Sequence, residues 1–202
     1  MAIGLGIALY SRGNYDEAVK SLLRASDLNP TDPRCYLFLS KAYDSSPIQA
    51  EEVIQRFRRF SELQPRNARA LYYYAMSLWK GRRAQDASLD VHQIESLLKK
   101  STELEPNLAE AHLQLGNLYS DQSKYAEAVL EYERALQENA DLADAHYRLG
   151  QAYVHTGQKE LAQQQLDLYQ RLRAQRLAEL DKQRADVRQF VYSAKDAPGS
   201  KQ

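Results

Sequence analysis

The sequence predicts an all-α solenoid of repeated helix pairs, closed by an extended C-terminal helix. The stretch at 113–128 reads LQLGNLYSDQSKYAEA, and its outline returns at 147–162 as YRLGQAYVHTGQKELA. Apolar residues recur at three- and four-residue spacing on both sides of short polar turns such as SRGNY and DQSKY. This spacing is typical of amphipathic helices, and the alternation typical of strands is absent from the sequence.

Five repeat units account for most of the chain. Three of them end alike, in SDLNP, SELQP and TELEP, so that Pro30, Pro65 and Pro106 follow the last helical turn. Proline stops a helix because it has no backbone N–H and its ring clashes with the preceding turn. The fourth unit ends in QENAD, without the proline. The predicted units lie near 1–32, 33–67, 68–108, 109–142 and 143–176.

Small and large residues at fixed positions explain how such units pack. Glycines and alanines let neighbouring helices approach closely, and tyrosines fill the space between them. One helix pair cannot bury its apolar face alone, so stacked neighbours complete the core. The residues concerned in the last two units are Gly116, Gly150, Ala128, Ala162, Tyr119 and Tyr153.

This outline resembles the tetratricopeptide repeat family, whose 34-residue unit has large, Leu, Gly, Tyr, Ala, aromatic, Ala and Pro positions in that order. The fourth unit matches with His112, Leu115, Gly116, Tyr119, Ala128, Tyr132 and Ala135. The first unit matches with Leu5, Gly6, Leu9, Ala18, Leu22, Ala25 and Pro30. The resemblance implies a right-handed solenoid. Because the first unit starts partway through the outline, we expect the chain to be a fragment of a longer protein.

Three units depart from the pattern. Ser40 and Ala75 stand where glycine is usual, and the third unit carries an insertion within GRRAQDASLDVHQI. In the fifth unit Tyr169 replaces the later alanine, so we do not expect an ordinary sixth repeat to stack there. The stretch 159–191 has no proline or glycine and is rich in strong helix formers, which predicts one long helix. We expect its distal part, 177–191, to extend past the fifth repeat, and 192–202 to form a flexible tail.

Composition and charge limit the classes of partner. The chain has 202 residues, of which 44% are hydrophobic, enough to bury a core. Lysines and arginines number 27, as do aspartates and glutamates, so no global charge directs the chain to nucleic acid or membrane. Locally, 34–83 has ten basic residues against four acidic, and 101–144 has two against ten. This favours an acidic protein segment as partner and disfavours nucleic acid, which the acidic section would repel.

The sequence offers little chemistry for catalysis or metal binding. His112 and His146 occupy the same position in successive repeats, which indicates packing rather than a metal site. The pair His92 and Glu95 in the insertion is a weak signal that fits a solvated helix start. Cys35 is expected to be buried, and no phosphate loop, nucleophile elbow or zincin motif is present. We therefore expect no enzyme activity, no cofactor and no metal.

No signal for a compartment is found. The apolar opening is about ten residues long and lacks a basic region before it, which is too short for a membrane span of roughly 20 residues and unlike a signal peptide. The localisation is left open.

The resemblance also implies a concave groove lined by the first helix of each repeat. Carried onto this sequence, the groove positions are Arg34, Leu37, Lys41, Arg69, Tyr72, Met76, Trp79, Leu113, Asn117, Tyr147 and Gln151. Trp79 fits either the groove or the core, since LYYYAMSLW is aromatic enough to supply both. Chaperone-binding relatives hold a C-terminal carboxylate with lysine and asparagine side chains of their first helices. This clamp is absent here, because the fifth position of the first helix carries Leu37, Tyr72, Leu113 and Tyr147.

We predict a non-enzymatic interaction scaffold that holds an extended peptide or a partner helix in this groove. Two alternatives remain open: a regulatory or substrate-docking arm of a larger enzyme, and a structural module that assembles with itself. In the second alternative the C-terminal helix forms a homodimer through its apolar stripe, although Arg173 and Arg184 interrupt that stripe.

Overall fold

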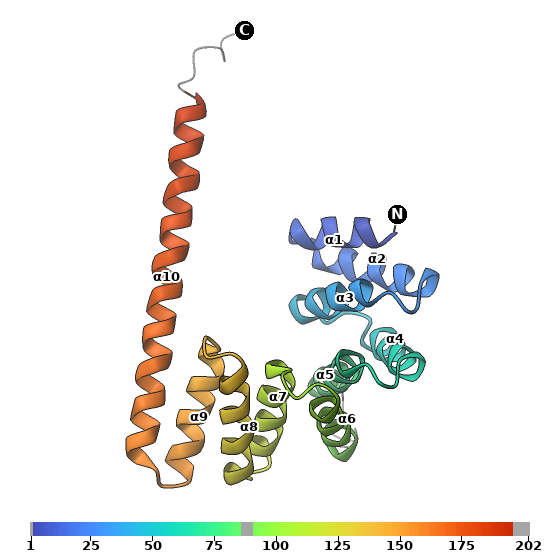
Figure 1. Cartoon of the computed structure of the whole chain (residues 1–202). Coiled ribbons are helices and arrows are strands. Elements are labelled where there is room, and N and C mark those ends of the chain that lie inside the picture. The colour runs from blue at the N-terminus through green and yellow to red at the C-terminus, as the bar shows by residue number, and fades with distance from the viewer. Residues whose placement is uncertain (1, 86–90, 196–202) are drawn as a thin grey trace. The chain divides into compact units, whose positions relative to one another are not determined.

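The computed structural model describes residues 2–85 and 91–195, and within these ranges the regular structure is α-helical (Figure 1). The helices are α1 (Ala2–Ser11), α2 (Tyr15–Leu28), α3 (Pro33–Ser45), α4 (Ala50–Leu63), α5 (Ala68–Gln85), α6 (Val91–Leu104), α7 (Ala109–Asp121), α8 (Tyr125–Glu138), α9 (Ala143–His155) and α10 (Lys159–Lys195). The predicted all-α class and the long C-terminal helix are confirmed. The helix α10 continues to Lys195, past the predicted end at 191, so residues 192–195 of the predicted tail are helical. The rest of that tail, 196–202, lies outside the described residues.

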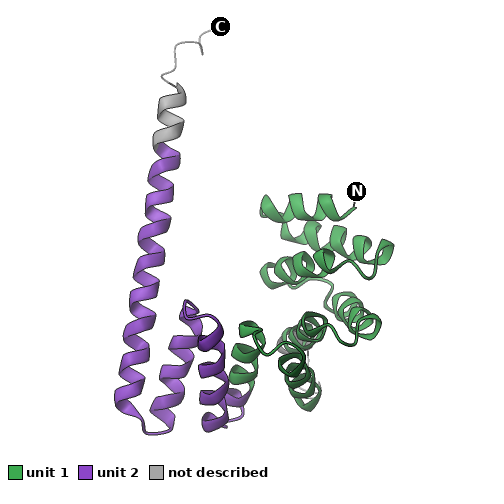
Figure 2. Ribbon diagram, in the orientation of Figure 1, with its two compact units in different colours: residues 1–118 green, residues 119–202 purple. Residues whose placement is uncertain are grey.

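The chain divides into two compact units (Figure 2). Unit 1 comprises residues 1–118 and unit 2 comprises residues 119–202, so the division falls within α7. In unit 1, α3 contacts both α1 and α5, while α2 and α4 pack on the helices that flank them in the sequence. In unit 2, α9 packs between α8 and α10.

The turns between paired helices share one backbone feature. In three of these turns the second residue after the first helix has a positive φ, namely Gly13 (79°), Ser123 (61°) and Gly157 (81°). Glycine adopts this left-handed conformation at no steric cost, whereas a serine pays for its Cβ. The polar turns recognised in the sequence therefore reverse the chain in the same way in both units.

Two buried glycines mark close helix approaches. A Cβ added at Gly6 would lie 2.6 Å from Leu22 Cγ, and one added at Gly150 would lie 3.0 Å from Leu166 Cγ and 3.3 Å from the Ala162 carbonyl oxygen. Real side chains essentially never approach as closely as the first distance. The close approach predicted for Gly150 is confirmed, and Gly6 does the same between α1 and α2.

A hydrogen bond at equivalent positions links the first helix of three pairs to the turn before it. Tyr36 Oη donates to the Pro30 carbonyl at 3.0 Å, and the Nε2 atoms of His112 and His146 lie 2.9 and 3.0 Å from the carbonyl oxygens six residues earlier, those of Pro106 and Ala140. All three side chains are buried. The histidines therefore pair with carbonyl groups of the turns that follow α6 and α8, in agreement with the predicted structural role.

The core of unit 1 contains a cluster of aromatic rings. Tyr36 and Phe60 are stacked with ring centroids 3.9 Å apart and an interplanar angle of 7°. Phe57 lies 5.9 Å from Tyr36 and 5.8 Å from Tyr73, so the cluster joins α3, α4 and α5. Phe57 and Phe60 are 1% and 0% exposed, which places this cluster at the centre of the unit.

Cys35 is expected to be unreactive in the folded protein. Its side chain is 1% exposed and Sγ donates to the Leu22 carbonyl at 3.1 Å, while burial raises the pKa of the thiol to about 12. The thiolate is the reactive form, so we expect Ellman's reagent at pH 8 to label the native chain far more slowly than the chain in 6 M guanidinium. Equal labelling rates in the two conditions would contradict this packing of α3 on α2.

Candidate functional site

The sequence-predicted groove residues of unit 1 gather on two adjacent helices. Leu37 and Lys41 belong to α3, and Tyr72 and Met76 belong to α5, which contacts α3. Leu37, Tyr72 and Met76 are partly exposed, whereas Lys41 is exposed. We call this set, Leu37, Lys41, Tyr72 and Met76, the α3–α5 face.

The tyrosine of this face is held by packing on one side. Tyr72 contacts the small buried cluster of Ala68, Leu108 and Ala111, and its ring lies 5.6 Å from that of Tyr73. Burial, with the carboxylates of Glu110 and Asp44 nearby, raises the pKa of Tyr72 far above its ordinary value. The phenol is neutral at physiological pH, as an ordinary tyrosine is, and can serve as a hydrogen-bond donor.

Three cations beside the face already have acidic partners. Arg34 makes a two-point contact with Asp32, at 3.0 Å for Nε to Oδ1 and 2.7 Å for Nη2 to Oδ2, and this hydrogen bond lowers the pKa of Asp32. The other two ion pairs are longer, with Lys80 at 3.2 Å from Asp44 and Arg69 at 3.6 Å from Glu105.

Lys41 differs from these three. Its ammonium group lies over the ring of Phe38, 5.7 Å from the centroid, and no ion pair of Lys41 is found among the residues whose side chains the structure describes. The exposed ammonium group thus remains accessible to an anionic group from outside, next to the apolar surface of Leu37.

Two of the predicted groove residues belong to the core instead. Trp79 is 6% exposed and Leu113 is 8% exposed. Their side chains are too buried to meet a ligand without a rearrangement of the helices around them. The alternative interpretation of Trp79 as a core residue is the one the structure supports, and we leave both residues out of the site.

In unit 2, the predicted residues lie along α9. Tyr147 is 38% exposed, its ring lies 5.1 Å from that of Tyr169, and it accepts a hydrogen bond from Gln151 Nε2 at 2.8 Å. Asn117, in unit 1, is partly buried and donates to Gln114 Oε1 at 3.1 Å. The side-chain amides of Gln151 and Asn117 are therefore both hydrogen-bonded within their own helices. To anchor a peptide, each amide would have to give up its present hydrogen bond.

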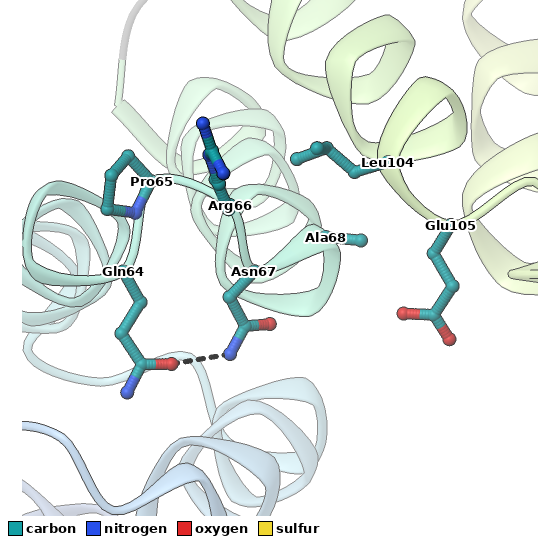
Figure 3. A pocket seen from close by; sticks show the side chains of 7 residues that line it. All are labelled: Gln64, Pro65, Arg66, Asn67, Ala68, Leu104 and Glu105. Carbon is teal, nitrogen blue, oxygen red and sulfur yellow. Dashed lines mark hydrogen bonds between the residues drawn. The ribbon is translucent and has the colours of Figure 1, made fainter.

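A surface depression that sequence reasoning missed lies at the turn between α4 and α5. It is lined by Gln64, Pro65, Arg66, Asn67, Ala68, Leu104 and Glu105 (Figure 3). Asn67 Nδ2 donates to Gln64 Oε1 at 2.6 Å, which orders the turn. The only signal in the sequence is the leucine of SDLNP, SELQP and TELEP, which is exposed at Leu28, Leu63 and Leu104. The lining is a mixture of amide, cationic, anionic and apolar groups, with no arrangement of a reactive site.

No group of three or more potential metal ligands occurs among the described residues. His92 is exposed near the start of α6, and Glu95, which is partly buried, pairs with Lys99 at 2.7 Å. The described helices include none that is long and apolar enough to cross a membrane.

Comparisons with known proteins agree with this architecture. A family model described as TPR repeat matches residues 6–44 and 116–157, and two described as tetratricopeptide repeat match 97–129 and 143–176. Over 72 residues the chain is 35% identical to Superkiller complex protein 3 of Mus musculus, a match that covers 36% of this chain and 5% of that protein. The matched segment is therefore a small part of that relative.

Solved structures show the same fold at low sequence identity. The crystal structure of MamA aligns with a TM-score of 0.65 and 18% identity, covering 86% of this chain and 96% of that one. YrrB, described as a TPR protein with an unusual peptide-binding site, aligns with a TM-score of 0.58 and 19% identity, covering 91% and 90%. With family matches over more than half of its length and paired helices throughout the described residues, this chain belongs to the tetratricopeptide repeat family.

Proposed function

We propose that this chain is a non-enzymatic interaction module that holds an extended peptide or a partner helix on the α3–α5 face of unit 1. Tetratricopeptide repeats mediate protein–protein interactions, and the structurally similar YrrB is described as having a peptide-binding site. The observation that carries the proposal is the partial exposure of Leu37, Tyr72 and Met76 on the contacting helices α3 and α5, together with the exposed Lys41 one turn after Leu37.

The chemistry of this face suits a short segment with apolar and acidic residues. Tyrosine offers a large contact area with a polar tip, and methionine adapts its shape to different apolar partners. Lys41 offers a positive charge with no ion pair to be broken within the described residues. The excess of basic residues over 34–83 would attract an acidic segment during the encounter.

The proposal is tested by selecting peptides from a random library against the whole chain and measuring their binding to variants. We expect the selected peptides to combine acidic and apolar residues. Met76→Glu places a charge in the apolar contact and Lys41→Glu reverses the cation, so each should weaken binding by about tenfold or more.

The matched control is Lys100→Glu, which makes the same charge change at an exposed lysine of α6. It should leave the affinity within about twofold of wild type, since rim or remote surface charges contribute little. If the Met76 and Lys41 variants bind the selected peptides as tightly as this control does, the α3–α5 face is not the binding site.

A further inference from the structure

The helix α10 packs on α9 through one defined face. Leu166 and the Ala162 carbonyl oxygen are the atoms closest to Gly150, and the ring of Tyr169 contacts that of Tyr147. These contacts fix the orientation of α10 in unit 2, with Ala162 3% exposed and Leu166 and Tyr169 partly buried.

The same face continues beyond the contact with α9. A helix turns by 100° per residue, so steps of three or four residues stay on one side. From Tyr169 these steps lead through Arg173, Leu177, Leu180, Arg184 and Val187. Figure 1 shows α10 extending far past the end of α9, and Leu177, Leu180 and Val187 are 58%, 42% and 62% exposed. We call these three residues the distal stripe.

Four arginines lie on or beside the distal stripe, and one acidic residue lies at its edge. Arg173 and Arg184 lie in line with the stripe, and Arg176 and Arg188 lie beside it, by the same angular count. Of the acidic groups of this segment, Glu179 and Asp186 point to other sides of the helix by that count, whereas Asp181, four residues after Leu177, lies at the edge of the stripe. The contacts of these arginines are weak ones. Arg184 is 3.6 Å from Asp181, with both side chains well exposed, and Arg188 Nε donates to the Arg184 carbonyl at 3.3 Å.

We propose that the distal half of α10, residues 173–188, binds an acidic amphipathic helix of a different protein. The partner lies along the distal stripe and so continues the packing that α9 begins. Its leucine-type residues cover Leu177, Leu180 and Val187, and its carboxylates pair with Arg173, Arg176, Arg184 and Arg188. At 1.5 Å per residue the segment is about 22 Å long, which accommodates a partner helix of about four turns.

The charges favour this occupant over two others. In an antiparallel pairing of two copies that places Leu177 against Leu180, the same register places Arg173 opposite Arg184, so like charges meet. A lipid surface favours a broad apolar face with cations around it, whereas here Arg173 and Arg184 divide the apolar residues themselves. A helix of another protein can place one carboxylate opposite Arg173 and another opposite Arg184. This inference concerns unit 2 and does not depend on the α3–α5 face.

The experiment uses the full chain and a defined probe. The probe is a fluorescein-labelled 21-residue amphipathic peptide with leucine at heptad positions a and d and glutamate at e and g, and a version with lysine at e and g is the reverse probe. We expect the glutamate probe to bind wild type, more weakly at high salt. It should bind at least about tenfold more tightly than the lysine probe and about tenfold more tightly than it binds Arg173→Glu/Arg184→Glu.

The matched control is Arg171→Glu/Lys182→Glu, which changes the net charge equally on the opposite side of the same helix. It should bind the glutamate probe as wild type does, with the helicity of both double variants checked by circular dichroism. Hydrogen exchange of wild type should show protection by the probe at 173–188. The proposal would be overturned if both double variants lost binding equally, or if wild type did not bind the probe. It would also be overturned if the chain bound phosphatidylserine vesicles more tightly than the probe, or if wild type formed a dimer that Leu180→Asp disrupts.

Discussion

Replacing Phe60 with alanine is expected to lower the free energy of unfolding of unit 1 by about 3–5 kcal/mol, the usual cost of deleting a buried aromatic ring. Phe60 is fully buried and stacks on Tyr36 at 3.9 Å. Its loss leaves a cavity between α3 and α4 that rigid helices fill only in part. Urea denaturation followed by circular dichroism measures the effect as a lower midpoint.

The matched control is Leu63→Ala on the same helix, because Leu63 is 48% exposed. That change should cost less than about 1 kcal/mol. If Phe60→Ala and Leu63→Ala shift the urea midpoint equally, the aromatic cluster is not the core of unit 1.

Gly150→Leu is expected to destabilise unit 2 by about 2–3 kcal/mol, in the upper range for overpacking. The first carbon alone would lie 3.0 Å from Leu166 Cγ and 3.3 Å from the Ala162 carbonyl oxygen, so α9 and α10 must separate. Hydrogen exchange measured over α9 and α10 reports the effect as faster exchange in both helices.

Gln151→Leu is the control for this change, since it adds a leucine at the adjacent, exposed position of α9. Exchange in α10 should then stay close to that of wild type. An unchanged exchange rate in Gly150→Leu would mean that the two helices do not approach at this glycine.

The sequence predicted the helices well because the pattern of the repeat reports local physics. Glycine and alanine at fixed spacing indicate close approach, which Gly150 shows directly in its contact with Leu166. The absence of proline and glycine over 159–191 indicated a single helix, and α10 spans that stretch. Each of these signals depends on residues near one another in the chain or one repeat apart.

The candidate site was less predictable, because exposure depends on how helices pack against each other. Trp79 and Leu113 occupy groove positions of the repeat, yet both are buried. The availability of Lys41 depends on which cations find carboxylates across helices, as Lys80 finds Asp44. The arginines along the distal stripe were visible in the sequence as interruptions of an apolar seam. The sequence alone did not show which side of α10 packs on α9. The contacts of Leu166 and Tyr169 with α9 show that the arginines continue along that same side.

Hydrogen exchange of the chain bound to its selected peptide locates the bound segment without any substitution. If the peptide binds the α3–α5 face, exchange should become slower in α3 and in residues 68–80 of α5, with little change in α2, α4 and α6. Protection confined to α2, α4 or α6, or none in α3 and α5 at saturating peptide, would contradict the assignment of binding to the α3–α5 face.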